Sequence, residues 1–245
     1  MQYVSLFLCV FILSSCHQPG YQIRTYHHSG YTLTDTLFPS EKYFYVFDGE
    51  AQYPIYYIGP AKGNISITQK IERHTPRDTA TRLISRTFDS TSLSVEVIDS
   101  ISTFIQTEFS HFDTSANKYE RDSVVTHPAF MLVLKNHSDS TLWLGDKNFL
   151  QFIRLEVQND CDQWIPVELP SGNSYGPDSW LSYIYLLPEH MLIAKFPEYE
   201  RNYSHNCRLA WTTQRGSMIY SNEFWTPVSN VIHNIANSSC FKRTN

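Results

Sequence analysis

Alanine and glycine are scarce in this chain of 245 residues, which holds 8 Ala and 9 Gly. Alanine is the strongest helix former and glycine dominates collagen-like repeats, so this scarcity excludes coiled-coil and collagen-like classes. Aromatic residues are abundant, at 15% of the chain, and Ser and Thr together number 46. Because aromatic and β-branched side chains suit a pleated surface, the composition predicts a β-rich protein.

The sequence also lacks any concentration of charge of one sign. Lys and Arg number 19 and Asp and Glu number 24, which gives a net charge of −5 spread along the chain. Nucleic-acid-binding proteins carry a clustered basic surface, so no nucleic-acid partner is expected. The length allows either one large all-β domain or two smaller ones.

No apolar run is long enough to cross a membrane as a helix. Residues 3–13 are apolar except for Ser5, but such a segment is too short for about 30 Å of hydrocarbon. It fits the apolar region of a signal peptide, here residues 1–15, and no charged side chain precedes Arg24. The alternative is a buried N-terminal strand or helix.

The segment Leu13-Ser14-Ser15-Cys16 resembles the lipobox of bacterial lipoproteins. The resemblance implies that Cys16 becomes the first mature residue and carries lipid, and that residues 16–22 form a short tether. Each buried methylene contributes about 0.8 kcal/mol, so two or three acyl chains hold a protein stably at a membrane. His17 stands where enterobacterial lipoproteins retained at the inner membrane have Asp. The resemblance therefore implies an outer-membrane lipoprotein that faces the periplasm.

Cysteine usage predicts one disulfide. Of five cysteines, Cys9 leaves with the signal peptide and Cys16 is lipidated, so Cys161, Cys207 and Cys240 remain. Both Cys161 and Cys207 lie in strand-like sequence of the same half, which favours a bridge between them and a free Cys240. The alternative is three independent thiols. No Cys or His spacing fits a structural zinc site, and no metal is predicted.

Short strands separated by polar turns recur through the chain, and this pattern predicts an all-β fold, a β-sandwich. Residues 91–109 fit both a helical stripe and a strand, but their β-branched content favours a strand. The architecture is expected to be immunoglobulin-like without an antibody-type core, because Trp164 follows Cys161 too closely and His205 replaces the expected Tyr before Cys207. The strongest predicted strands are residues 42–47, 53–58, 64–71, 130–135, 141–144, 149–157, 164–169, 180–187, 191–196, 207–211 and 218–221.

A polar segment, residues 110–121, is the expected boundary between two β-rich regions, residues 23–115 and 122–233, with a flexible tail at 234–245. The second region resembles uncharacterised Bacteroidota lipoproteins over about residues 130–225. The likeness lies in short motifs, among them WIPVE at 164–168, SGNSY at 171–175 and YSNEF at 220–224. It implies an exported β-domain with no known activity and no site residues.

No nucleophile elbow, HExxH motif, phosphate-binding loop or calcium loop occurs in the sequence, so no catalytic residue and no cofactor is predicted. The expected function is a non-catalytic interaction or structural role, with a membrane contact through the anchor and an envelope protein as partner. A glycan-binding lipoprotein is the alternative, because sugars stack on exposed aromatic rings. Its candidate residues are Trp164, Tyr175 and Trp180, whose rings could equally pack in the core. An enzyme with a cryptic site is a third possibility.

Overall fold

The computed structural model of this chain is built of strands, which confirms the predicted all-β, sandwich-like class. It describes residues 22–28, 30–37, 50–51, 53–68, 71, 84–85, 88–145, 149–150, 152–170, 184–199, 201–213, 216–238 and 240. Several predicted features lie outside these ranges: the predicted lipidation residue Cys16, the binding candidates Tyr175 and Trp180, and the predicted strand 42–47. Within them, no helix is both long and apolar enough to cross a membrane.

The main sheet has five strands in the order β10-β4-β15-β8-β7 and is antiparallel throughout. Its central strand β15 is buried on both faces. Leu192 and Phe196 point into the larger hydrophobic core, while Met191 and Ile193 point into a smaller one. Successive strand residues face opposite sides, so a doubly covered strand needs apolar residues at nearly every position. Lys195, which is buried as well, is the charged exception in β15. The strands are β4 (Tyr53–Pro60), β7 (Leu93–Asp113), β8 (Lys118–Asn136), β10 (Phe149–Leu150) and β15 (His190–Pro197).

A second sheet packs against one face of the main sheet through the larger core. Its strands run in the order β12-β11-β16-β17, and β18 also pairs with β16. Phe224 of this sheet lies 5.6 Å from Phe196 and 5.8 Å from Phe130 of the main sheet, measured between ring centroids. The strands are β11 (Ile153–Gln158), β12 (Trp164–Pro166), β16 (Tyr203–Thr212), β17 (Met218–Tyr220) and β18 (Phe224–Val228).

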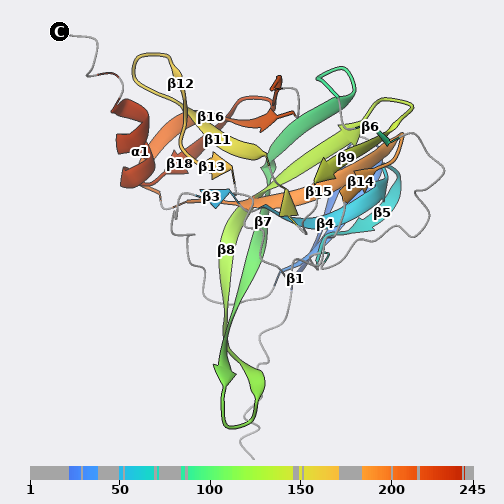
Figure 1. Cartoon of the computed structure of the whole chain (residues 1–245), viewed down its shortest axis with the longest axis vertical. Coiled ribbons are helices and arrows are strands. Elements are labelled where there is room, and N and C mark those ends of the chain that lie inside the picture. Colours follow the sequence, from blue (N-terminus) through green and yellow to red (C-terminus); the bar gives the residue numbers. More distant parts are fainter. Residues whose placement is uncertain are drawn as a thin grey trace, which may run out of the picture.

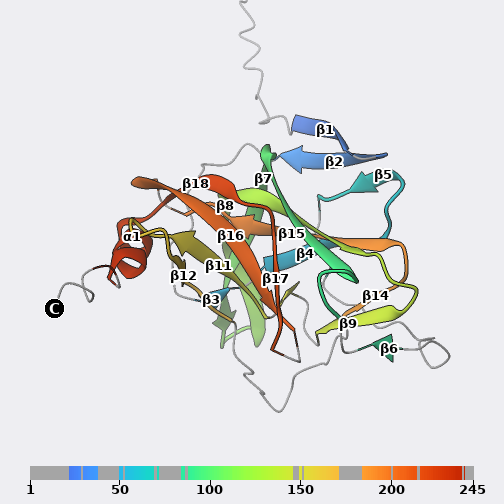
Figure 2. The same cartoon turned by 90° about the horizontal axis from the view of Figure 1, so that it is seen from above.

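A third layer covers the other face of the main sheet (Figure 2). It consists of β1 (Gln22–His28), β2 (Tyr31–Leu37) and β5 (Gly63–Ser66), and its buried Leu33 and Ile65 belong to the smaller core with Met131. The remaining short strands form two small sheets. One has two strands, β3 (Glu50–Ala51) and β13 (Leu169–Pro170), and the other has three, with β9 (Thr141–Gly145) between β6 (Ile84–Ser85) and β14 (Ile184–Leu186).

Strands β7 and β8 form a long hairpin that projects from the rest of the described chain (Figure 1). The strand interpretation of residues 91–109 is thus confirmed, and the helical alternative is wrong. The turn lies at residues 114–117, where the Asp113 carboxylate accepts hydrogen bonds from Ser115 and Ala116. The polar segment 110–121, expected to divide two regions, is the end of this hairpin. Strands from both expected regions share the main sheet.

The C-terminal part contains the helix α1 (Asn230–Asn237), whose N-cap is Ser229. The expected flexible tail is therefore wrong for residues 234–237.

Cys240 forms a disulfide with Cys161, so the predicted Cys161–Cys207 bridge is also wrong. Cys207 points into the larger core as a buried free thiol, whereas Cys161 lies in the exposed turn between β11 and β12. Because Cys161 is at the surface and Cys207 faces the core, the two side chains do not point toward each other.

Candidate binding face

The outer face of the second sheet carries a continuous set of polar and aromatic side chains. Strand β11 alternates, with Ile153, Leu155 and Val157 buried in the core and the residues between them directed outward. Strand β16 does the same, because Cys207 and Leu209 face inward. The outward positions of the two strands therefore lie side by side, and they are Arg154, Glu156 and Gln158 on β11 and Asn206 and Arg208 on β16.

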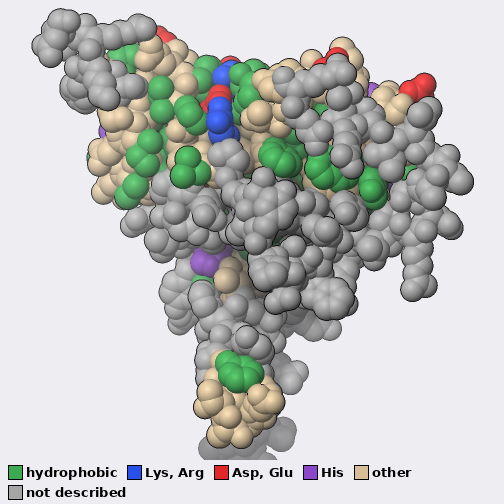
Figure 3. Space-filling model, in the orientation of Figure 1, with side chains coloured by type: hydrophobic (Ala, Val, Ile, Leu, Met, Phe, Trp, Pro, Cys, Tyr) green, Lys and Arg blue, Asp and Glu red, His purple; other side chains and the backbone are tan. Residues whose placement is uncertain are grey.

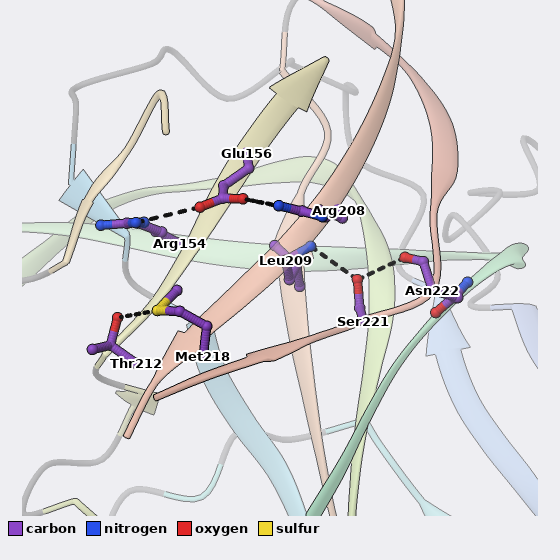
Figure 4. Close-up of polar contacts among 8 residues, drawn as sticks. All are labelled: Arg154, Glu156, Arg208, Leu209, Thr212, Met218, Ser221 and Asn222. Atoms are coloured by element: carbon purple, nitrogen blue, oxygen red, sulfur yellow. Dashed lines mark hydrogen bonds and ion pairs between the residues drawn. The ribbon is translucent and has the colours of Figure 1, made fainter. Parts of the chain in front are cut away.

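Glu156 lies at the centre of this face and pairs with two arginines (Figure 4). Its Oε2 accepts hydrogen bonds from Arg208 Nη2 at 2.9 Å and Arg208 Nε at 3.0 Å, while its Oε1 lies 3.3 Å from Arg154 Nη2. Figure 3 shows basic and acidic side chains side by side over β11 and β16, with hydrophobic side chains around them. The charges at the middle of the face are therefore largely engaged with one another.

The guanidinium of Arg208 is also enclosed by two aromatic rings. Its central carbon lies 4.2 Å from the ring centroid of Trp164 on β12 and 3.8 Å from that of Tyr220 on β17. Cation–π contacts of this kind stabilise a partly desolvated arginine. Trp164, a predicted binding residue, thus lies on the candidate face, half-buried and with Arg208 against its ring.

Trp225 on β18 is the most exposed aromatic side chain on this face, at 65% exposure. It pairs in register with Asn206, whose Nδ2 donates to Gln158 Oε1 at 3.2 Å and to Glu223 Oε2 at 2.7 Å. Gln158 in turn pairs in register with Trp164. Four neighbouring strands therefore present one row, which we call the tryptophan row: Trp225, Asn206, Gln158 and Trp164.

The corner between β17 and β18 is held by side-chain hydrogen bonds rather than by a regular ladder (Figure 4). Ser221 Oγ accepts from the Leu209 amide at 2.9 Å and donates to the Asn222 carbonyl at 2.7 Å. The Asn222 side chain accepts from the Val97 amide at 2.8 Å and donates to the Val97 carbonyl at 3.0 Å. These contacts fix the corner to β7, and so they set the position of the strand that carries Trp225.

A histidine pair lies where α1 meets the second sheet. His205 Nδ1 is 3.1 Å from the Gln158 carbonyl oxygen, which can only accept, so this nitrogen carries the proton. His205 Nε2 lies 2.8 Å from His233 Nδ1, so in the neutral pair His233 donates to His205. The His233 ring stacks on Tyr203 with centroids 3.9 Å apart. The pair joins the helix to the sheet.

Glu168 and the Cys207 thiol are buried inside the molecule, away from this face. Glu168 accepts hydrogen bonds from the hydroxyls of Tyr53 and Tyr199 and from the Leu155 amide at 2.7 Å. Burial raises the pKa of Tyr53, and burial beside Glu168 also raises the pKa of the Cys207 thiol, so that thiol stays protonated. These groups face the core rather than a binding surface.

The comparisons give no assignment for the face. Protein-family models, curated proteins and solved structures were compared with this chain, and no match was found. In the part of the chain that the structure describes, no group of three or more His, Cys, Asp or Glu could hold a metal ion.

Of the residues on the candidate face, the sequence analysis proposed Trp164 but missed Trp225, Asn206, Gln158 and Arg208. In FWTPV at 224–228, strand alternation places Trp225 on the opposite face from Phe224 and Thr226, and this was the signal available for Trp225. The structure buries Phe224 and Thr226 and exposes Trp225.

Proposed function

We propose that this chain is a lipid-anchored cell-envelope protein that acts by binding a partner, without catalysis, at the outer face of its second sheet. The observation that carries the binding role is the exposure of Trp225 on a face whose central charges already pair with one another. Tyr220, at 44% exposure, lies on the same face, and exposed aromatic rings gathered on one face are typical of a recognition surface.

The anchor at Cys16 is the second part of the proposal, and it rests on the lipobox resemblance. Two or three acyl chains at Cys16 would hold the folded domain at the outer membrane, on its periplasmic side, through the short tether at residues 16–22. The domain itself then needs no membrane contact, and its outer sheet face is available to a partner.

The anchor is tested by replacing Cys16 with alanine and separating membranes from soluble material. The expected result is release of the Cys16→Ala protein from the membrane fraction, because the thioether to the lipid can no longer form. The wild-type protein should remain in membranes, and its precursor should accumulate when globomycin blocks signal-peptide removal. A Cys16→Ala protein that stays membrane-bound would disprove the anchor.

The binding face is tested in cells with a photo-reactive amino acid at position 225 of the anchored protein. Irradiation should give an adduct of higher mass, and the same amino acid at Phe112 is the control. Phe112 is likewise exposed, at 44%, but it lies near the hairpin end, away from the face. Equal yields at the two positions, or no adduct at 225, would remove this face from the proposal.

A further inference from the structure

The tryptophan row combines two kinds of chemistry at regular spacing. Trp225 and Trp164 stand at its ends, and the amides of Asn206 and Gln158 stand between them on adjacent strands. Neighbouring strands lie about 4.8 Å apart, so the two tryptophan positions are about 14 Å apart across three strand spacings. That span suits a short oligosaccharide better than a single small molecule.

The hydrogen-bonding atoms of the row also suit a ligand rich in hydroxyl groups. The Asn206 nitrogen donates to Gln158 and Glu223, while the Gln158 oxygen accepts. Among the described residues, the side-chain atoms Asn206 Oδ1 and Gln158 Nε2 have no hydrogen-bond partner, since the bonds of these two side chains use Asn206 Nδ2 and Gln158 Oε1. One is an acceptor and the other a donor, which is the combination that a sugar hydroxyl can satisfy.

The charges of the face argue against an anionic ligand. The Glu156 carboxylate is shared by Arg154 and Arg208, and the Arg208 guanidinium is enclosed by Trp164 and Tyr220. An anionic ligand would have to displace Glu156 from these arginines, and it would also be repelled by the exposed Glu223 carboxylate. A neutral ligand leaves the pairs intact and uses the exposed Trp225 ring and the amides.

We propose that the tryptophan row binds a neutral glycan, with one sugar ring stacked on Trp225 and its hydroxyl groups hydrogen-bonded to Gln158, Asn206 and Glu223. This inference rests on the proposed binding function and names its ligand class. Stacking places the C–H face of a pyranose on the indole, while the hydroxyls at the rim of the sugar meet the amides and the carboxylate. The Arg208 contact holds Trp164 in place at the far end of the row.

The test uses the full lipidated protein in detergent and four neutral hexasaccharides of different linkage: maltohexaose, laminarihexaose, mannohexaose and xylohexaose. Heparin serves as an anionic comparison. Binding is followed by titration calorimetry and by tryptophan fluorescence, because a sugar stacked on Trp225 removes that indole from water. At least one neutral hexasaccharide is expected to bind with a blue shift of emission, and heparin is not.

Matched variants locate the site. Trp225→Ala is expected to weaken binding at least about tenfold, Trp225→Tyr to retain part of it because a ring remains, and Phe112→Ala to leave it unchanged. Binding of none of the four sugars, binding of heparin alone, or unchanged binding by Trp225→Ala would overturn the glycan proposal. A photo-adduct with a protein at position 225, together with no sugar binding, would overturn the glycan ligand while leaving the proposed binding function in place.

Discussion

Lys195 and Asp35 form an ion pair in which both side chains are only 2% exposed. Lys195 Nζ lies 2.9 Å from Asp35 Oδ2 and 3.1 Å from the Phe104 carbonyl oxygen, and it lies over the Tyr56 ring at 4.3 Å from the centroid. Burial lowers the pKa of Lys195, although the Asp35 charge opposes this effect. The pair links β2 of the third layer to the central strand β15.

Replacing Lys195 with methionine is expected to lower the free energy of unfolding by about 3–5 kcal/mol, because Asp35 becomes a buried charge without its cation. Urea denaturation followed by fluorescence measures this loss. The double variant Lys195→Met, Asp35→Leu is the control and should recover most of the stability, since no charge is then left buried. A loss below about 1 kcal/mol in the single variant, as for an exposed pair, would contradict this account.

Tyr31 makes the stability of the folded protein depend on pH in the alkaline range. Burial, with a smaller contribution from the Glu96 charge, raises the pKa of Tyr31 from 10.0 to about 12. A raised folded-state pKa favours the neutral phenol in the folded protein. The stability from this residue is therefore complete below about pH 10 and is lost as the pH rises towards 12.

We expect the unfolding free energy to fall across this alkaline window, with less dependence on pH in Tyr31→Phe. Urea titrations at several alkaline pH values measure the effect, and tyrosinate absorbance reports ionisation directly. If Tyr31→Phe follows the same alkaline profile as the wild type, the ionisation of Tyr31 is not what destabilises the protein.

At the scale of elements, the disulfide secures α1 against the turn between β11 and β12. It joins Cys161 to Cys240 across 79 residues, with Cα atoms 6.0 Å apart. Asn159 and Asn237 add hydrogen bonds between the same two segments: Asn159 Nδ2 donates to the Ala236 carbonyl at 3.3 Å, and the Asp160 amide donates to Asn237 Oδ1 at 2.9 Å. The helix is therefore fixed at its C-terminal end.

Cys240→Ser is expected to lower the unfolding free energy by about 2–4 kcal/mol, because the unfolded chain loses a long closed loop. Denaturant unfolding of the oxidised wild type against Cys240→Ser measures this difference, and in reductant the two should become nearly equal. Thiol counting provides an independent check: the mature oxidised protein should show one thiol, Cys207, and only after denaturation. Three reactive thiols would rule out the bridge.

For the molecule as a whole, local sequence patterns predicted elements well and their partners poorly. The apolar run at 191–196 predicted a strand, and alternation predicted the shared face of Ile153, Leu155 and Val157, since both are local patterns. Cys161 and Cys207 were paired because both lie in strand-like sequence of the same half, but such a pattern does not say where a turn residue lies in space. Helix α1 was not predicted: its first residues were assigned to the β-region and residues 234–237 to a tail, although Ser229 as N-cap and the Ile232–Ala236 spacing were available signals.

The candidate face was less predictable than the fold. Trp164 could be proposed from its residue type, but the row exists only because β18 and β12 lie on opposite sides of the β11–β16 pair. That order joins Gln158 and Trp164 to Asn206 and Trp225, which come more than 40 residues later in the sequence. Pro227 also weakens the strand pattern around Trp225, because proline is disfavoured inside sheets. Long-range pairing, not local propensity, assembles this surface.

The order of strands in the main sheet also determines how the chain depends on its own C-terminal part during synthesis. Strand β4 lies between β10 and β15, both of which come more than 80 residues later, and β15 also supplies the second partner of β8. A nascent chain that ends before residue 190 would thus leave β4 and β8 with open edges, which recruit other chains. Premature termination should yield aggregates and substrates for proteases, rather than a smaller working protein.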